Sequence, residues 1–338
     1  MSPSHRPWVA DPAIGWRILL TAELPEPPDR PGVADRLGSV AGHQGWPAPP
    51  PLRAGDDLRT LQRDLVHADP APLVVGVAGS HLVLSAHHSA VDGLGLLVLL
   101  ERLGAGPVRS GARGTGPRTT TGGAARTTTR RLREALLHPP ARVTPPPGVP
   151  SGTGDALATR TVAGAHRTAA LVHAATRAVV AHERARGRSA EHVAIAVGAV
   201  RDQPEDVATA AVADRSVLLR LTDVERLDAD GIARALATAP VQTPPAAGGH
   251  PLLARATAAG LRALAPRLGS TLLVSHLGEV TAAGVRGLTF HPVTAGGTGL
   301  SLGAVGHGGT TTLTLRGRAS AWNDNGLEQL LEAVVSLL

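Results

Sequence analysis

The chain of 338 residues contains no cysteine, no lysine and no tyrosine. The absence of cysteine excludes disulfides, thiolate metal sites and a cysteine nucleophile. The absence of lysine and tyrosine excludes a lysine Schiff base and a phenolic general acid. Proton transfer near neutral pH therefore falls to histidine, aspartate or glutamate. Of these, histidine has the ordinary pKa closest to neutrality.

Aromatic residues are scarce, with four tryptophans and one phenylalanine, so no stacking platform for nucleic acid is expected. Arginine supplies all 33 basic charges, and these are dispersed along a chain of net charge +6. No apolar run approaches the ~20 residues that a membrane helix needs. The N-terminus has no apolar signal-peptide core. We therefore expect a cytoplasmic protein without a membrane span and without a nucleic-acid partner.

Apolar periodicity predicts alternating strands and helices, and hence a mixed α/β fold with two similar-sized lobes. The expected strands cover 16–22, 72–77, 81–86, 193–201, 214–221, 271–275, 300–304 and 310–315. The expected helices cover 33–40, 57–66, 94–102, 129–137, 164–185, 229–237 and 252–264, with a last helix capped by Asn325 or Asp324.

Composition divides the chain. Residues 1–12 are a flexible N-terminal extension, and 13–138 form the N-terminal lobe. Within that lobe, 106–129 are rich in Gly, Thr and Arg without apolar periodicity, which predicts a mobile loop. The Pro- and Gly-rich stretch 139–160 is a stiff linker. Residues 161–338 form the C-terminal lobe.

One motif carries the candidate chemistry. His87-His88-Ser89-Ala90-Val91-Asp92-Gly93 lies between an apolar strand and an apolar helix. A plain structural role for the histidine pair is one alternative. A metal site at His88 and Asp92 is another, but no third ligand lies at a recognisable spacing, so we expect no metal.

The pattern of two histidines, three residues, then Asp-Gly resembles the signature of the chloramphenicol-acetyltransferase-like superfamily. That superfamily includes condensation domains of nonribosomal peptide synthetases, wax ester synthases and polyketide-associated acyltransferases. Further segments resemble its second lobe. They are a strand 194–201 ending in Arg201, Ala213-Asp214-Arg215-Ser216 in place of a Gly-Asn opening, Ser275-His276-Leu277-Gly278 with His for Asn, Phe290-His291-Pro292-Val293, and 296–300.

The resemblance implies two acetyltransferase-like lobes in a V-shaped pseudo-dimer around a central tunnel. His88 would be catalytic, taking the proton from an acceptor or holding that acceptor in line. The implied supporting residues are His87, Asp92 paired with Arg201, and Gly93, which would leave room for a pantetheine arm. The N-terminus of the following helix could stabilise negative charge.

Ser275 and His276 are neighbours on a strand and face opposite ways, so they form no dyad, but one of them could line the tunnel. The implied function is a free-standing condensation-like acyltransferase of natural-product biosynthesis. It would hold no permanent cofactor and would take a phosphopantetheine thioester from an acyl or peptidyl carrier protein in trans. The acceptor would be a small-molecule amine or alcohol.

Three alternatives remain: an acyl-CoA-dependent enzyme, a non-catalytic member that binds a carrier, and a non-acyl reaction such as cyclisation at the same histidine. Arg130-Arg131 and Arg133 could receive an acidic carrier protein or could form an ordinary solvated face.

Overall fold

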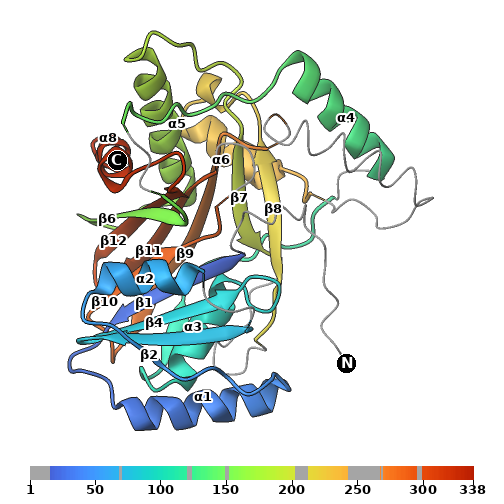
Figure 1. Ribbon diagram of the computed structural model, residues 1–338. Helices are drawn as coiled ribbons and strands as arrows, with labels where there is room; N and C mark the ends of the chain where they lie inside the picture. The colour runs from blue at the N-terminus through green and yellow to red at the C-terminus, as the bar shows by residue number, and fades with distance from the viewer. Residues whose placement is uncertain are drawn as a thin grey trace, which may run out of the picture.

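The computed structural model is a mixed α/β protein built on two β-sheets (Figure 1). It describes residues 16–67, 71–119, 124–148, 152–201, 212–242, 267, 269–294 and 299–338. The expected fold class is therefore confirmed. The expected extension 1–12 and the helix over 252–264 lie outside the described residues. In the described part, no helix is long and apolar enough to cross a membrane.

Most elements of the first half correspond to predicted strands and helices, but the short strands at 53–54 and 108–110 were not predicted. They are β1 (Arg17–Glu23), α1 (Arg30–Gln44), β2 (Arg53–Ala54), α2 (Leu58–Val66), β3 (Leu73–Ala78), β4 (His81–His87), α3 (Gly93–Arg102), β5 (Val108–Ser110) and α4 (Ala124–Leu137).

The second half supplies the larger sheet and its covering helices. Its elements are β6 (Asp155–Ala163), α5 (Thr168–Arg184), β7 (Ile195–Val200), β8 (Ser216–Leu221), the 3₁₀ helix η1 (Val224–Arg226), α6 (Ala229–Thr238), β9 (Leu272–Ala282), β10 (Gly287–His291), β11 (Leu300–His307), β12 (Thr310–Arg318) and α8 (Asp324–Val335).

The first sheet has the strand order β10-β1-β4-β3-β2 and packs on both faces. Along β1, Ile18 and Leu20 belong to the apolar core shared with α1 and α3, whereas Leu19 packs with Leu61 and Leu65 of α2. Successive side chains of a strand point to opposite faces. Because both faces are covered, β1 is an almost unbroken apolar run rather than an alternating one.

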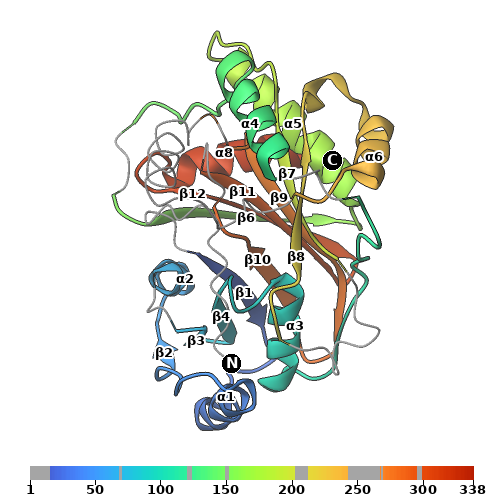
Figure 2. The ribbon, with the colours of Figure 1, turned by 90° about the vertical axis from the view of Figure 1, so that its right-hand side faces the viewer.

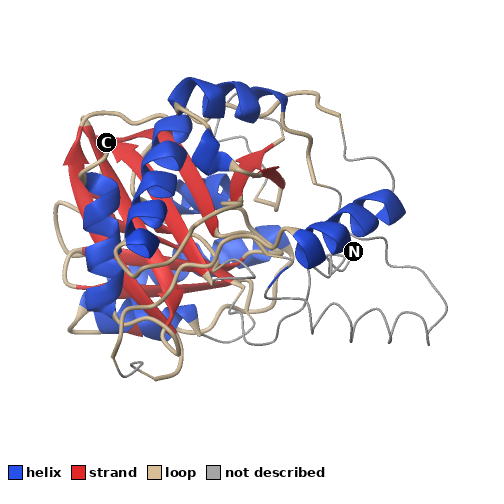
Figure 3. Cartoon of the chain, turned by 90° about the horizontal axis from the view of Figure 1, so that it is seen from above, coloured by secondary structure: helices blue, strands red, loops and turns tan. Residues whose placement is uncertain are grey.

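The second sheet has the strand order β6-β12-β11-β9-β7-β8. Helices lie against one face (Figure 3), where Leu302 of β11 packs in a core with Leu171 of α5 and Leu331 of α8. The other face is directed at the first sheet, because Leu273 and Leu277 of β9 belong to the core of α1 and α3. The space between the sheets is thus largely filled by apolar side chains.

The two sheets exchange strands. β10 comes from the second half but pairs antiparallel with β1, with His291 opposite Leu19. It lies beside β1 in Figure 2. β5 comes from the first half and pairs antiparallel with β9. The predicted division into 13–138 and 161–338 therefore does not separate the two sheets.

Two predicted loop segments contain regular structure. The stretch 106–129 includes β5, in which Val108 is buried, and the first residues of α4. The predicted linker 139–160 ends earlier than expected, because β6 begins at Asp155. In both cases the strand is fixed by its sheet partner, β9 or β12, and not by local periodicity.

The N-cap of the last helix is not one of the predicted residues, Asn325 or Asp324. Asn323 is the N-cap of α8, and its Oδ1 accepts a hydrogen bond from the Gly326 N–H at 2.8 Å. Asp324 and Asn325 lie inside the helix. The Asp324 carboxylate instead forms an ion pair with Arg59 of α2 at 3.2 Å.

A buried arginine joins the two sheets. Arg316 of β12 is fully buried, and its Nε donates to Asp155 Oδ2 at 2.6 Å. Its Nη1 donates to the carbonyl oxygens of Arg17, at 2.7 Å, and Pro292, at 3.0 Å. Since Arg17 lies in the first sheet and Asp155 in the second, one guanidinium fixes the position of both. A buried charge is tolerated only when it is paired and hydrogen-bonded in this way.

Candidate active site

The histidine motif lies where β4 ends and α3 begins, as predicted. His87 is the last residue of β4, and Gly93 is the first residue of α3. Asp92 is the N-cap, and its Oδ1 accepts a hydrogen bond from the Gly95 N–H at 2.7 Å. An Asp cap satisfies one of the free N–H groups of the first turn. The motif therefore forms a short loop that is fixed at both ends.

His88 is half-buried and its ring is oriented by the loop itself. Its backbone N–H donates to the carbonyl oxygen of Trp16 at 2.7 Å, next to β1. Its Nδ1 lies 3.2 Å from the carbonyl oxygen of Val91. A carbonyl oxygen only accepts, so this contact assigns a proton to Nδ1 and, in the neutral tautomer, leaves Nε2 unprotonated. Within the described residues, Nε2 makes no hydrogen bond.

His87 supports the loop. Its backbone N–H donates to the carbonyl oxygen of Pro72 at 2.9 Å, and its Nδ1 lies 2.7 Å from Ser89 Oγ. The ring therefore contacts the residue that follows His88. This arrangement fits the predicted structural role and places His87 beside the candidate base.

Asp92 is buried and braces a different partner from the one predicted. Its Oδ2 accepts a hydrogen bond from the Arg215 N–H at 2.9 Å, just before β8. Its own N–H donates to the carbonyl oxygen of Ala213 at 3.3 Å. Burial raises the pKa of Asp92, while the hydrogen bonds from Gly95 and Arg215 oppose that rise. The Asp92 carboxylate thus joins the motif loop to the start of β8.

Arg201 does not form the predicted pair. It is exposed at the end of β7, and among the described residues no ion pair links it to Asp92. Its backbone N–H donates to the carbonyl oxygen of Arg215 at 3.4 Å, which places it near the Asp92 bridge without contact between the side chains. Sequence similarity points to the segment 213–216 but not to this contact, because any residue type supplies a backbone N–H.

The predicted oxyanion role of the α3 N-terminus is also weakened. The carboxylate of Asp92 occupies the Gly95 N–H, and its charge opposes the positive end of the helix. Negative charge developing on a thioester oxygen would therefore meet an already capped helix. We assign α3 the role of positioning the motif loop.

Gly93 makes room for packing between the lobes. A Cβ added at this position would lie 2.5 Å from Leu277 Cδ2 and 3.4 Å from Phe290 Cζ. The space beside its Cα is therefore filled by side chains of β9 and β10. The prediction that this space is open for a pantetheine arm is not met. The glycine allows α3 to approach both strands closely.

Replacing Gly93 by alanine is expected to lower the free energy of unfolding by about 1–3 kcal/mol, because the new methyl group overpacks this contact. Chemical denaturation measures the change. Shortening the neighbour in a Gly93→Ala/Leu277→Val variant should recover part of the loss. If the single variant kept full stability and only raised the KM for a thioester, the packing role would be wrong.

Ser275 and His276 face opposite sides of β9, as expected. Ser275 shares the face of Leu273 and Leu277, which is directed at the first sheet. His276 points the other way, and its Nδ1 lies 3.3 Å from the hydroxyl of Thr168 at the start of α5. Ser275 is therefore the one placed between the lobes, while its role in lining a tunnel stays a prediction.

Two histidines outside the motif, His276 and the fully buried His291, have lowered pKa values. Burial lowers the pKa of His276 to about 4, with a smaller contribution from His166. Burial lowers the pKa of His291 to about 3, and the Arg316 cation adds to this. As the pH falls, these two rings are therefore protonated in the unfolded chain at a higher pH than in the folded chain. The stability that these two rings contribute is fully present above about pH 6.5, and it is lost as the pH falls from 6.5 towards 4.

A His276→Asn variant is expected to lose less stability on acidification than the wild type. Between pH 7.5 and 4.5 the difference should be about 2–3 kcal/mol, since one pKa unit corresponds to about 1.4 kcal/mol. Urea unfolding at the two pH values measures it. His291 leaves a residual slope in both proteins. Equal losses in the two proteins would show that His276 does not carry the effect.

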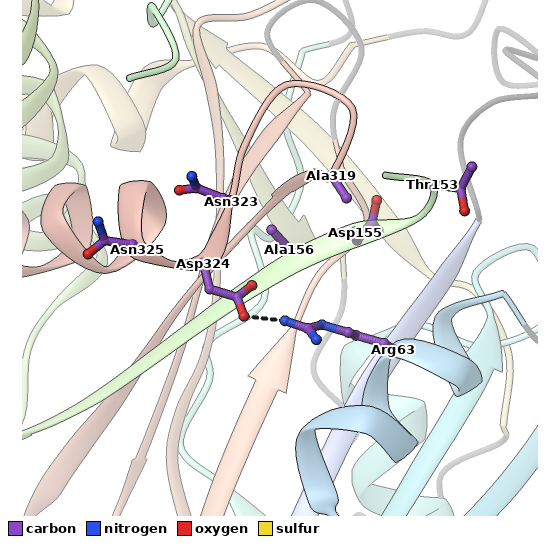
Figure 4. Close-up of a pocket in the computed structure, with 8 residues that line it drawn as sticks. All are labelled: Arg63, Thr153, Asp155, Ala156, Ala319, Asn323, Asp324 and Asn325. Carbon is purple, nitrogen blue, oxygen red and sulfur yellow. Dashed lines mark hydrogen bonds and ion pairs between the residues drawn. The ribbon is translucent and has the colours of Figure 1, made fainter. Parts of the chain in front are cut away.

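A separate pocket of about 380 Å³ lies between α2 and the start of α8. Figure 4 shows Arg63 of α2 reaching Asp324, with which it forms an ion pair. The pocket is lined by Arg63, Thr153, Asp155, Ala156, Ala319, Asn323, Asp324 and Asn325. No motif residue lines it, so we do not assign it to the chemistry of His88.

No group of three or more His, Asp or Glu residues in the described ranges could hold a metal ion. Because three protein ligands are the usual minimum for a catalytic zinc, His88 and Asp92 alone are too few. The described loop therefore offers one imidazole, with its neighbouring carboxylate used as the cap of α3.

The fold has counterparts among solved structures, although no family model and no curated protein matches the sequence. The first condensation domain of the calcium-dependent antibiotic synthetase, in complex with a substrate analogue, is 18% identical with a TM-score of 0.56. The match covers 97% of this chain and 92% of that one.

Two further structures agree. The EpoB NRPS cyclization-docking bidomain from Sorangium cellulosum is 14% identical with a TM-score of 0.55, covering 95% of this chain and 79% of that one. A mutant starter condensation domain of the rhizomide synthetase RzmA, in complex with C8-CoA and Leu-SNAC, is 13% identical with a TM-score of 0.54, covering 96% and 88%. The chain therefore has the chloramphenicol-acetyltransferase-like fold of condensation domains, as the motif predicted. The V-shaped arrangement with a tunnel stays a prediction.

Proposed function

We propose that the chain is a condensation-like acyltransferase, which moves an acyl group from a carrier-bound thioester to an amine or hydroxyl acceptor. The observation that carries the proposal is the state of His88. Its Nδ1 contacts the carbonyl oxygen of Val91, which leaves Nε2 available as a base on the loop between β4 and α3, in a chain with the fold of condensation domains. A base fixed in one tautomer is the requirement for proton transfer at neutral pH.

The proposed reaction transfers the acyl group from the thioester sulfur to the acceptor nitrogen or oxygen. The acceptor N–H or O–H gives its proton to His88 Nε2 while its nitrogen or oxygen forms a bond to the thioester carbonyl carbon. The carbon–sulfur bond then breaks, and the leaving thiolate takes the proton from the imidazolium. An amide or ester and a free thiol result, and His88 returns to its neutral form.

His87 and Asp92 act as positioning residues in this proposal. His87 holds Ser89, and Asp92 fixes both the first turn of α3 and the backbone of Arg215. The phosphopantetheine thioester is a co-substrate that a carrier protein brings in trans. An acyl-CoA donor is the second candidate, supported by the similarity to a condensation domain crystallised with C8-CoA.

Thioester consumption tests the proposal. Purified protein is incubated with octanoyl-loaded acyl carrier protein or octanoyl-CoA and with a panel of amines and alcohols, and the released thiol and the product are quantified. Acceptor-dependent thiol release supports the acyltransferase, and the preferred donor decides between carrier and CoA. Carrier binding without consumption of any thioester would favour the non-catalytic alternative.

A further inference from the structure

The outer face of α4 carries positive charge around exposed apolar side chains. Leu136 and Leu137 are each 60% exposed, and Arg130 and Arg133 are also exposed. Arg133 is three residues from Arg130 and Leu136 and four from Leu137, so the four side chains are neighbours on the helix surface. We call these four residues the α4 patch. The helix projects from the body of the protein in Figure 1.

Exposed large apolar side chains are rare elsewhere. Among the described residues the others are Leu337 and Leu338. The only acidic residue of α4, Glu134, is turned to the protein body, where it forms an ion pair with Arg220 of β8 at 2.6 Å. The patch therefore keeps its positive charge. Apolar side chains rimmed by charge are typical of a protein interaction site.

The helix that carries the α4 patch and the motif loop contact opposite ends of β8. At one end of this strand, the Arg215 N–H holds the Asp92 carboxylate. At the other end, Arg220 holds Glu134 of α4. A strand of this length spans about 17 Å between those two residues. A partner bound at α4 would thus contact a helix that is tied to β8, and the residue before β8 holds Asp92 of the motif loop.

We propose that the α4 patch is the docking surface for an acidic carrier protein that delivers the thioester donor. This inference rests on the proposed function. The two arginines fit acidic side chains on a carrier helix, and the two leucines fit its apolar residues. A second copy of this chain is a poorer occupant, because its net charge is +6.

Charge reversal at the patch tests the assignment. An Arg130→Glu/Arg133→Glu variant is compared with the wild type, using octanoyl-loaded acidic acyl carrier protein and octanoyl N-acetylcysteamine as donors. The KM for the carrier-bound donor should rise at least ~10-fold, since like charges at an interface weaken association. The kcat/KM for the small thioester should stay within about twofold. Arg286→Glu, at the exposed turn between β9 and β10, is the matched control and should change neither value.

The outcomes separate this inference from the proposed function. Unchanged KM for the carrier donor in the double variant would overturn the docking surface and leave the acyltransferase standing. If the wild type consumes no thioester, fluorescence anisotropy with labelled holo acyl carrier protein decides. Binding that is weakened at least ~10-fold by the double substitution, but not by Arg286→Glu, supports the surface. Absent or unaffected binding, or preferential binding of an oligonucleotide, overturns it.

Discussion

Replacing His88 by alanine is expected to lower kcat/KM for acyl transfer by at least ~100-fold, the usual cost of removing a general acid or base. The reason is that the described loop offers one oriented imidazole with an open Nε2, fixed by the contact between Nδ1 and the Val91 carbonyl. Thiol release in the assay above measures the loss. Circular dichroism checks that the variant is folded.

The His87→Ala variant is the control for this result, because the two histidines are adjacent but differently used. Loss of the contact with Ser89 should lower the rate by a smaller factor, without changing the pH profile of kcat/KM. If His88→Ala turned over as fast as the wild type, the proposed mechanism would be wrong. If His87→Ala abolished activity and His88→Ala did not, the roles of the two would be reversed.

Replacing Asp155 by alanine is expected to destabilise the protein by about 3–5 kcal/mol. The substitution leaves the guanidinium of Arg316 buried and without its carboxylate, and an uncompensated buried charge is strongly unfavourable. Urea unfolding at neutral pH measures the change. Because Arg316 also binds the carbonyl oxygen of Arg17, we expect the contact between the sheets to loosen as well.

Two variants sharpen this test. Glu332→Ala breaks the exposed ion pair with Arg160 and should cost less than about 1 kcal/mol, since water already screens that pair. Asp155→Leu/Arg316→Met removes both charges and should be more stable than Asp155→Ala alone, although two carbonyl oxygens lose their donor. An Asp155→Ala variant as stable as Glu332→Ala would contradict the buried-pair interpretation.

The local structure of the candidate site could be predicted because its signals are local. The apolar runs 81–86 and 94–100 flank the motif, and Asp92 is a residue type that caps helices. His88 thus falls between β4 and α3 as expected. The alternation along β9 also placed Ser275 and His276 on opposite faces.

The remaining features depend on partners that are distant in sequence. An apolar pattern indicates that β10 is buried but not that it pairs with β1. Arg215 donates a hydrogen bond to Asp92 through its backbone N–H, a group that almost any residue type supplies. The resemblance implies a pairing of Arg201 with Asp92, whereas in the structure the backbone of Arg215 contacts Asp92. The closeness of Leu277 to Gly93 likewise follows only from the packing of α3 on β9.

The strand exchange has a consequence for synthesis of the protein on the ribosome. β1 is translated early, but its neighbour on the outer edge of the first sheet is β10, residues Gly287–His291. Until those residues leave the ribosomal exit tunnel, β1 has an unpaired edge that can template wrong pairing with another chain. The first sheet therefore completes only after His291 has been translated. Expression of the N-terminal half alone should give an aggregating fragment.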